Sequence, residues 1–368
     1  MICLGGCMSQ EKHVVEKVKK SYPQVDIIFG THNLHKLPEM IKTKLNENRK
    51  VYDVWDIDGE VIEGLPVKRV SEKNALVTIM YGCNNFCTYC IVPYVRGRER
   101  SRKPEDILKE IKELAQEGYK EIMLLGQNVN SYDGGNEYHF SNLLYDIDKI
   151  EGIDIVRFMS PHPKDFTDDV IEAIRSCKSV CKVIHLPLQS GSSNVLKLMN
   201  RKYTKEQYLT LVDKIRTQVP DVTFTTDIIV GFPGETEEDF QDTLDVVAKV
   251  KFEQVFMFIY SVRKGTIAEK MPNHIPDEVK SERFNRLKEL ADGITAEEMK
   301  KYVGTVQKVL VEGESKTNSD VLTGRTRSYK VVNFEGDKSL IGKEIDVEIV
   351  SEHVWYLKGR IKDDYSTF

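Results

Sequence analysis

The chain has 368 residues, of which 30% are charged and 40% hydrophobic, and its formal net charge at pH 7 is −5. This composition is typical of a globular protein with two or three domains, and the charge excludes a global attraction to nucleic acid, so any RNA contact must be a local patch. No apolar run reaches the length of a membrane span, and Met1–Leu4 is too short for a signal-peptide core. Seven cysteines, an odd number, argue against a secreted disulfide scaffold and favour a reducing cytoplasm.

The N-terminal part of the chain alternates short apolar strands with helices. The pattern predicts a strand end and glycine turn in residues 1–10, helices over 11–20 and 34–46, and a strand over 25–29. Residues 47–74 have the composition of a charged connector. We expect residues 1–62 to be the remnant of an N-terminal α/β domain with its linker, because a strand starting at Met1 would leave a parallel sheet without a neighbour. The pattern thus predicts a missing N-terminal segment.

A regular alternation of strands and amphipathic helices begins at Ala75. Six strand candidates start near Ala75, Glu121, Ile155, Val183, Thr223 and Gln254. Their apolar runs suggest strands buried on both faces. We therefore predict a partial (β/α)6 barrel in residues 70–300, and a barrel carries its chemistry at the carboxyl ends of its strands.

From about Tyr302 the pattern changes to short strands punctuated by glycines. Such a pattern predicts a small β-barrel in residues 302–368. The predicted fold class is therefore α/β: a partial barrel between a truncated N-terminal α/β domain and a small C-terminal β-barrel.

Three cysteines, Cys83, Cys87 and Cys90, stand at CxxxCxxC spacing in a loop after the first barrel strand. Thiolates hold iron–sulfur clusters, and three of them leave one iron of a [4Fe–4S] cubane open to a small ligand. A structural zinc site instead closes with four Cys or His ligands. We favour the cluster, with a zinc knuckle or a chance grouping as the alternatives.

Other polar residues follow the remaining strands, and each has a structural alternative. Gln127 and Asn128 could form a plain turn, and Arg201 could lie on a helix surface. Asp227 stands inside an apolar strand, where a carboxylate is costly unless it is paired, which favours a site. Cys177 and Cys181 are most simply packing residues.

A basic run follows the cysteine loop directly. Residues 95–103 contain Arg96, Arg98, Arg100 and Arg102. Clustered arginines suit phosphate contacts, and a solvated charged loop is an equally good interpretation.

Taken together, these segments resemble the radical S-adenosylmethionine (SAM) methylthiotransferase family, of the MiaB type that acts on tRNA. The matching segments are Gly6–Gln10, Tyr81–Cys90, Arg96–Arg102, Leu125–Tyr132, Ser160–Pro163, His185–Ser192, Met199–Arg201, Gly231–Thr236 and Tyr260–Thr266. The C-terminal strands resemble a TRAM RNA-binding domain, with Gly324–Thr326 and Val331–Phe334 at the expected places.

The resemblance implies a role for each candidate residue. Cys83, Cys87 and Cys90 would bind the cluster whose open iron takes SAM, and the reduced cluster would split SAM to a 5′-deoxyadenosyl radical. The SAM contacts would be Gln127, Asn128, Ser160, Gln189, Arg201 and Asp227, with Arg201 on the carboxylate and Asp227 on the ribose. The RNA contacts would be Arg96, Arg98, Arg100, Arg102, Arg325 and Arg327.

The resemblance also implies a substrate and partners. The family adds a methylthio group to C2 of N6-isopentenyladenosine next to the tRNA anticodon. It uses a second [4Fe–4S] cluster on three N-terminal cysteines, of which Cys7 matches the third and the first two have no counterpart, so we expect sulfur insertion to be incomplete in this chain. We further expect an electron donor such as flavodoxin or ferredoxin, no membrane, a monomer and a cytoplasmic location.

Two rival functions stay open at this point. One is the same chemistry on N6-threonylcarbamoyladenosine in tRNA or on an aspartate of a ribosomal protein. The other is a non-catalytic, metal-containing RNA-binding protein.

Overall fold

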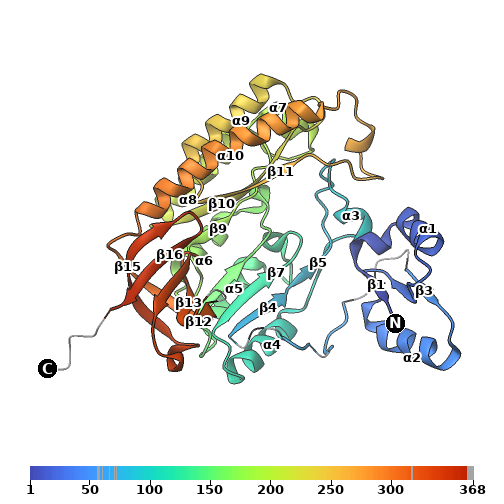
Figure 1. Cartoon of the computed structure of the whole chain (residues 1–368), viewed down its shortest axis with the longest axis horizontal. Coiled ribbons are helices and arrows are strands. Elements are labelled where there is room, and N and C mark those ends of the chain that lie inside the picture. The colour runs from blue at the N-terminus through green and yellow to red at the C-terminus, as the bar shows by residue number, and fades with distance from the viewer. Residues whose placement is uncertain are drawn as a thin grey trace.

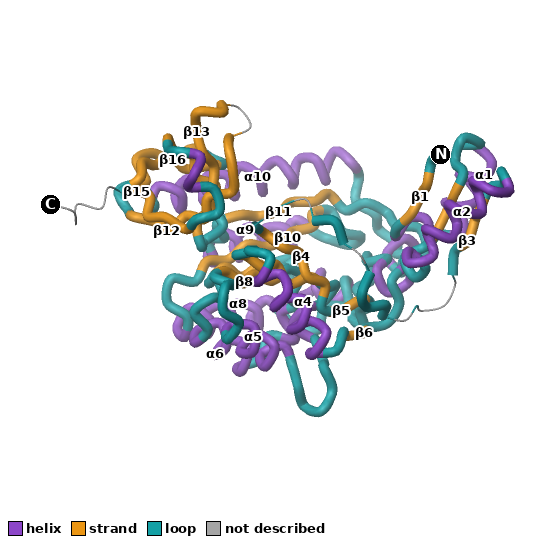
Figure 2. The backbone as a smooth tube through the Cα atoms, turned by 90° about the horizontal axis from the view of Figure 1, so that it is seen from below, coloured by secondary structure: helices purple, strands orange, loops and turns teal. Residues whose placement is uncertain are grey.

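The structure is a computed structural model that describes residues 1–55, 59, 61–65, 67–69, 71, 73–315 and 318–362. It has three parts, which we call the N-terminal unit, the central barrel and the C-terminal barrel. The N-terminal unit and the C-terminal barrel lie at opposite ends of the molecule, with the central barrel between them (Figure 1). The view from below shows the same order (Figure 2).

The N-terminal unit is a three-stranded parallel sheet in the order β1-β2-β3, accompanied by two helices. Its elements are β1 (Cys3–Gly5), α1 (Lys12–Ser21), β2 (Ile27–Phe29), α2 (Leu37–Glu47) and β3 (Val51–Asp53). The helices and the second strand lie within a few residues of their predicted positions. Strand β3 falls in the predicted connector, where its three half-buried residues give too short a pattern to be recognised.

The central barrel contains the six predicted strands as two parallel sheets of three, β4-β7-β8 and β9-β10-β11. Its strands are β4 (Asn74–Thr78), β7 (Glu121–Leu125), β8 (Ile155–Phe158), β9 (Val183–His185), β10 (Thr223–Val230) and β11 (Gln254–Ile259). Its long helices are α4 (Pro104–Gln116), α5 (Phe140–Asp148), α6 (Asp168–Ser176), α8 (Lys205–Gln218), α9 (Glu237–Val250) and α10 (Asp277–Lys300). A parallel bridge pairs Val156 of β8 with Val180, three residues before β9 begins, and so brings the two sheets side by side.

Hydrophobic spacing explains how the helices cover the sheets. Ile107, Ile111 and Leu114 of α4 share one helix face and are buried in the same cluster as Ala75 and Val77 of β4. The central barrel also contains short elements: β5 (Met80–Tyr81), α3 (Val92–Val95), β6 (Arg100–Ser101) and α7 (Ser193–Leu198).

The inner face of the central barrel departs from the prediction of strands buried on both faces. Ala75 and Val77 are fully buried, whereas Leu76 between them is 61% exposed. Phe256 and Phe258 of β11 are likewise 38% and 51% exposed. Because β4 and β11 end their sheets without closing on each other, their inward side chains face an open lumen.

The C-terminal barrel is closed, with strand order β12-β13-β14-β16-β15. Its strands are β12 (Val306–Ser315), β13 (Asn318–Thr326), β14 (Val331–Glu335), β15 (Glu344–His353) and β16 (Tyr356–Ile361). It meets the central barrel at the amino-terminal ends of the strands, where Asn74 Nδ2 donates to Glu312 Oε1 at 3.2 Å and Lys330 lies 2.7 Å from Glu253. The carboxyl ends therefore face away from it. No helix among the described residues is long and apolar enough to cross a membrane.

Candidate functional site

The cysteine loop begins where β5 ends at the carboxyl rim of the central barrel. Gly82 has φ +77°, and a Cβ there would lie 2.0 Å from the Arg98 carbonyl oxygen, so this close approach requires glycine. The Gly82 amide donates to Gln127 Oε1 at 2.7 Å, and the Cys83 amide donates to the Gly97 carbonyl at 3.2 Å. The loop is thus held between the β7 end and the basic run.

The three predicted cluster ligands share this loop. Cys83 and Cys87 are buried, Cys90 is half-buried, and all three are free thiols. Burial, with a smaller contribution from the neighbouring cysteines, raises the pKa of Cys83 and raises that of Cys90 to about 11. Cys83 and Cys90 therefore need a positive partner to ionise.

Two polar neighbours point at the sulfurs. Asn85 Nδ2 donates to Cys83 Sγ at 3.4 Å, and Arg201 Nη1 donates to Cys87 Sγ at 3.5 Å. The Asn85 contact favours the thiolate form of Cys83, which is the form that binds metal.

The described residues fit an iron–sulfur cluster better than a single zinc ion. No three His, Cys, Asp or Glu side chains in the described ranges are grouped to hold one metal ion. A structural zinc needs four ligands about 2.3 Å from one centre, whereas each thiolate of a cluster binds its own iron. Near the thiols, the buried Asn85 Oδ1 and Asn128 Oδ1 have no hydrogen-bond partner, as expected of acceptors placed for a ligand.

Arg201 is the most completely engaged residue of the site. Its Nε donates to Tyr203 Oη at 2.9 Å and its Nη2 to the Pro187 carbonyl at 3.0 Å, in addition to the Cys87 contact. Burial opposes its charge, but the neighbouring Tyr203, Tyr89 and Cys87 raise the pKa of Arg201. The helix-surface alternative for Arg201 is therefore wrong, because the side chain is buried against the cysteine loop.

The residues after β7 and β8 divide between loop support and ligand contact. Gln127 supports the cysteine loop through Gly82, and Asn128 Nδ2 donates to Asp165 Oδ2 at 2.8 Å. Ser160 has φ +63° and is exposed at the rim. The Oδ1 atom of Asn128 therefore remains available to accept a hydrogen bond from a ligand. The Oε1 atom of Gln127 already accepts one from the Gly82 amide.

A backbone hydrogen bond joins Gln189, in the segment after β9, to Asp227 of β10. The Gln189 amide, at φ +69°, donates to the Asp227 carbonyl at 2.8 Å. The Asp227 side chain lies 3.4 Å from His185 Nε2, and His185 Nδ1 lies 2.9 Å from Thr225 Oγ1. Asp227 is accordingly paired, as its place in an apolar strand requires.

The sequence analysis missed three residues of the site: His185, Tyr203 and Glu99. His185 is the last residue of β9, at the carboxyl end where a barrel carries its chemistry, a signal that could have identified it. Glu99 accepts from the Asn84 amide at 3.1 Å and Tyr203 donates to the carbonyl oxygens of Pro187 and Leu188, both at 3.0 Å. Only the fold brings these two to the cysteine loop.

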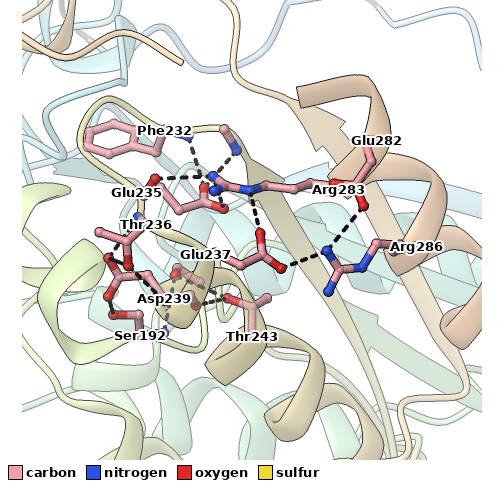
Figure 3. A network of polar contacts seen from close by, with 12 residues as sticks. Ser192, Phe232, Glu235, Thr236, Glu237, Asp239, Thr243, Glu282, Arg283 and Arg286 are labelled. Carbon is pink, nitrogen blue, oxygen red and sulfur yellow. Dashed lines mark hydrogen bonds and ion pairs between the residues drawn. The ribbon is translucent and has the colours of Figure 1, made fainter. Parts of the chain in front are cut away.

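A buried polar network fixes the loop that follows β10 (Figure 3). Glu235 Oε2 accepts from the Gly231 and Phe232 amides at 2.7 and 3.1 Å, and its other oxygen pairs with Arg283 at 3.3 Å. Phe232 packs edge-on against Tyr89 of the cysteine loop, with ring centroids 6.4 Å apart. The network therefore positions one wall of the site.

The four arginines of the basic run have different environments. Arg96 Nε donates to Cys7 Sγ at 3.2 Å, and the Arg98 guanidinium stacks on Phe86 at 4.4 Å. Arg100 donates to the carbonyls of Arg96 and Arg98. Arg102 is buried, and its guanidinium binds Glu63 at 2.5 Å and Glu110 at 2.7 Å, so it supports the fold rather than facing RNA.

The two predicted RNA arginines of the C-terminal barrel lie at the junction with the central barrel. Arg325 Nε donates to Glu312 at 3.0 Å. Arg327 binds Glu344 at 2.8 Å and donates to the Lys178 carbonyl at 3.1 Å. The structure does not bring them to the cysteine rim, and their carboxylate partners reduce their attraction for phosphate.

Two family models match the chain. The Radical SAM superfamily matches residues 77–247, and the TRAM domain matches residues 300–362.

Curated relatives match nearly the whole chain. A tRNA-2-methylthio-N(6)-dimethylallyladenosine synthase of Acetivibrio thermocellus is 55% identical over 98% of this chain and 76% of its own length. The synthase of the same name in Clostridioides difficile is 55% identical over 97% of this chain and 76% of its own length. Among solved structures, the cobalamin-dependent S-adenosylmethionine radical enzyme OxsB aligns with TM-score 0.47 and 13% identity, over 80% of this chain and 48% of that one.

Proposed function

The chain belongs to the tRNA-2-methylthio-N(6)-dimethylallyladenosine synthases, a family of radical SAM methylthiotransferases, and we propose that Cys83, Cys87 and Cys90 hold its SAM-binding [4Fe–4S] cluster. It is an enzyme that uses SAM and acts on tRNA, so the non-catalytic rival is wrong. The observation that carries the assignment of ligands is the placement of the three thiols in one loop at the barrel rim, with Arg201 3.5 Å from Cys87 Sγ. When bound, the cluster supplies the electron for reductive cleavage of SAM.

Arg201 and Asn85 prepare the thiols for this role. Each donates a hydrogen bond to a sulfur, and the Asn85 bond partly offsets the rise that burial causes in the pKa of Cys83. Arg201 uses three of its N–H groups on Tyr203, Pro187 and Cys87. A guanidinium has five such donors, so two remain, one on each terminal nitrogen, for the SAM carboxylate.

The remaining SAM contacts are assigned by chemistry. The orphaned Asn128 Oδ1 accepts from the SAM ammonium, with Ser160 at the same rim. Asp227 accepts from the ribose hydroxyls, and His185 orients it from 3.4 Å. Gln189 holds the strand end in place, and Gln127 acts on SAM indirectly by fixing Gly82.

The carboxyl rim of the central barrel indicates how the enzyme would bind its tRNA substrate. The target adenine C2–H is too weak an acid for a general base, so the site must enclose the base and exclude water during hydrogen abstraction. This requires the base to be unstacked and inserted into the lumen. Arg96, Arg98 and Arg100 lie at the rim beside the cysteine loop, where they can bind the flanking phosphates.

Three finer points extend the proposal. Cys7, held by Arg96, is the residue of the N-terminal unit that we assign to a second [4Fe–4S] cluster. We assign a flavodoxin- or ferredoxin-class protein as electron donor and a monomeric state. The free thiols of the described cysteines suit the reducing cytoplasm.

Mass spectrometry of tRNA nucleosides tests the function. Deleting the gene in its host should remove 2-methylthio-N6-dimethylallyladenosine and leave N6-dimethylallyladenosine in its place. The wild-type gene should restore the product and the Cys83→Ala gene should not, whereas an unchanged nucleoside profile after deletion would overturn the function.

A further inference from the structure

A cavity of about 340 Å³ lies between the inner face of the central barrel and the C-terminal barrel. Residues of β7 to β11 line one wall, and the 325–331 turn together with Val354 and Trp355 lines the other. None of the cysteines, and none of the residues assigned to SAM, lines this cavity.

The lining is largely apolar. Met123, Met159 and Phe256 contribute from the central barrel, and Val354 and Trp355 from the C-terminal barrel. Phe256 is 38% and Trp355 66% exposed, although both are large and apolar. Exposed apolar side chains gathered around a concave site indicate a ligand with an apolar part.

The cavity adjoins the predicted SAM ribose site. His185 and Thr225 line it, and Asp227 lies two residues beyond Thr225 on the same face of β10. Asp227 is also the register partner of Phe256, whose ring lies 5.7 Å from the His185 ring. A base placed against SAM can therefore extend a substituent into the cavity.

The charged residues of the lining are already neutralised. Each cation has its own carboxylate: Arg157 with Glu121 at 3.2 Å, Arg325 with Glu312 at 3.0 Å, and Lys330 with Glu253 at 2.7 Å. A neutral apolar group meets no unpaired charge here. A carboxylate entering the cavity would find no free cation among these three and would lie near Glu253.

We propose that this cavity receives the N6-dimethylallyl group of the target adenosine, and that its neutralised lining rejects the carboxylate of an N6-threonylcarbamoyl group. The inference rests on the proposed function and adds the residues that select the substrate. A five-carbon chain is small against this volume, which leaves room for part of the base.

Binding of three anticodon stem-loop RNAs to the cluster-reconstituted chain tests the proposal without turnover. The RNAs carry adenosine, N6-dimethylallyladenosine or N6-threonylcarbamoyladenosine at the target position. We expect the wild type to bind the dimethylallyl RNA about tenfold more tightly than the unmodified RNA, and the threonylcarbamoyl RNA no more tightly. Phe256→Ala and Trp355→Ala should each reduce this preference to about twofold while leaving affinity for unmodified RNA unchanged.

Ile259→Ala is the matched control, because Ile259 is 40% exposed on the same strand but outside the cavity lining. It should keep the full preference. Equal wild-type affinity for the dimethylallyl and unmodified RNAs, or a preference that survives both aromatic substitutions, would overturn the proposal. If the preference holds but the reconstituted chain does not cleave SAM, the proposed cluster site fails and the cavity assignment stands.

Glu312→Gln tests the charge argument separately. It removes the carboxylate of Arg325 at a partly exposed pair, so the fold should survive. Affinity for the threonylcarbamoyl RNA should rise about fivefold relative to unmodified RNA. An unchanged affinity would show that the paired charges do not exclude this substrate.

Discussion

Arg201 Nη1 lies 3.5 Å from Cys87 Sγ, although 114 residues separate the two in sequence. The contact ties the loop that carries the cluster ligands to the segment after α7. It also places a fixed positive charge beside a buried thiol, where no water can supply the same stabilisation.

Replacing Arg201 with Lys should weaken SAM binding by about 10- to 100-fold, because an ammonium cannot reproduce the planar set of donors. Equilibrium binding of SAM to the reconstituted protein measures this. Arg216→Lys is the control, since Arg216 also stacks on an aromatic ring but lies outside the site. Equal SAM affinity of Arg201→Lys and wild type would refute the assignment to the carboxylate.

Replacing Arg96, Arg98 and Arg100 together with Ala should weaken tRNA binding. It should also lower the slope of log Kd against the logarithm of the salt concentration by about 3, that is, by about one for each lost phosphate contact. Arg175→Ala, at an exposed pair on α6, should change neither quantity. An unaltered salt dependence in the triple variant would remove the basic run from the RNA surface.

Arg102→Ala should behave differently from its neighbours. It leaves Glu63 and Glu110 without their shared cation, so the free energy of unfolding should fall by about 3 kcal/mol. Denaturant unfolding measures this loss. If the Arg102→Ala protein were fully stable but bound tRNA more weakly, Arg102 would have to contact RNA rather than support the fold.

The buried His162 should make the protein acid-sensitive. Burial, together with the charges of Arg201 and Lys164, lowers the pKa of His162 to about 2. The unfolded chain takes up a proton below its ordinary pKa of about 6.5 and the folded chain does not, so stability is lost as pH falls through 6.5. Between pH 7 and pH 5, His162 alone should contribute a loss of about 2 kcal/mol to the free energy of unfolding.

His162→Asn should remove most of that pH dependence, because Asn keeps a hydrogen-bond acceptor near the Lys164 amide and does not titrate. Denaturant unfolding at several pH values provides the measurement. Equal slopes for wild type and His162→Asn would show that His162 is not the group responsible.

Arg157 should hold the C-terminal barrel in place. It pairs with the buried Glu121, donates to the carbonyls of Thr326 and Arg327, and stacks on Tyr329 at 4.6 Å. Arg157→Ala should cost about 3–5 kcal/mol, because it leaves Glu121 buried without a partner. The double variant Arg157→Met with Glu121→Gln should recover most of this, as measured by thermal unfolding and limited proteolysis between the barrels.

Much of the fold could be predicted because each element carries its own local pattern. The comparisons confirm the predicted family and fold class: a partial barrel, with a closed C-terminal barrel in the predicted TRAM region. The cysteine loop was visible as spacing within one segment. The roles of Tyr203 and Glu99 were not, because they depend on contacts between segments far apart in sequence.

The same reasoning explains where sequence patterns gave the wrong environment. Leu76 and Phe256 continue apolar runs and were expected to be buried, but the open edges of the central barrel leave both exposed to the lumen. Arg102 follows the same alternation as Arg98 and Arg100, and only the positions of Glu63 and Glu110 reveal that it is buried. The sequence pattern of apolar and charged residues does not show which side chains the fold brings into contact with them.

The central claim is that Cys83, Cys87 and Cys90 bind the cluster on which SAM cleavage depends, and iron content measured alongside 5′-deoxyadenosine formation tests it most directly. Each of the variants Cys83→Ala, Cys87→Ala and Cys90→Ala, reconstituted and given SAM and dithionite, should lose both the cluster absorption and the cleavage product. Cys177→Ala, at a buried cysteine packed in the barrel core, should keep both. A triple variant of the loop cysteines that retained full iron and cleaved SAM at the wild-type rate would contradict the account.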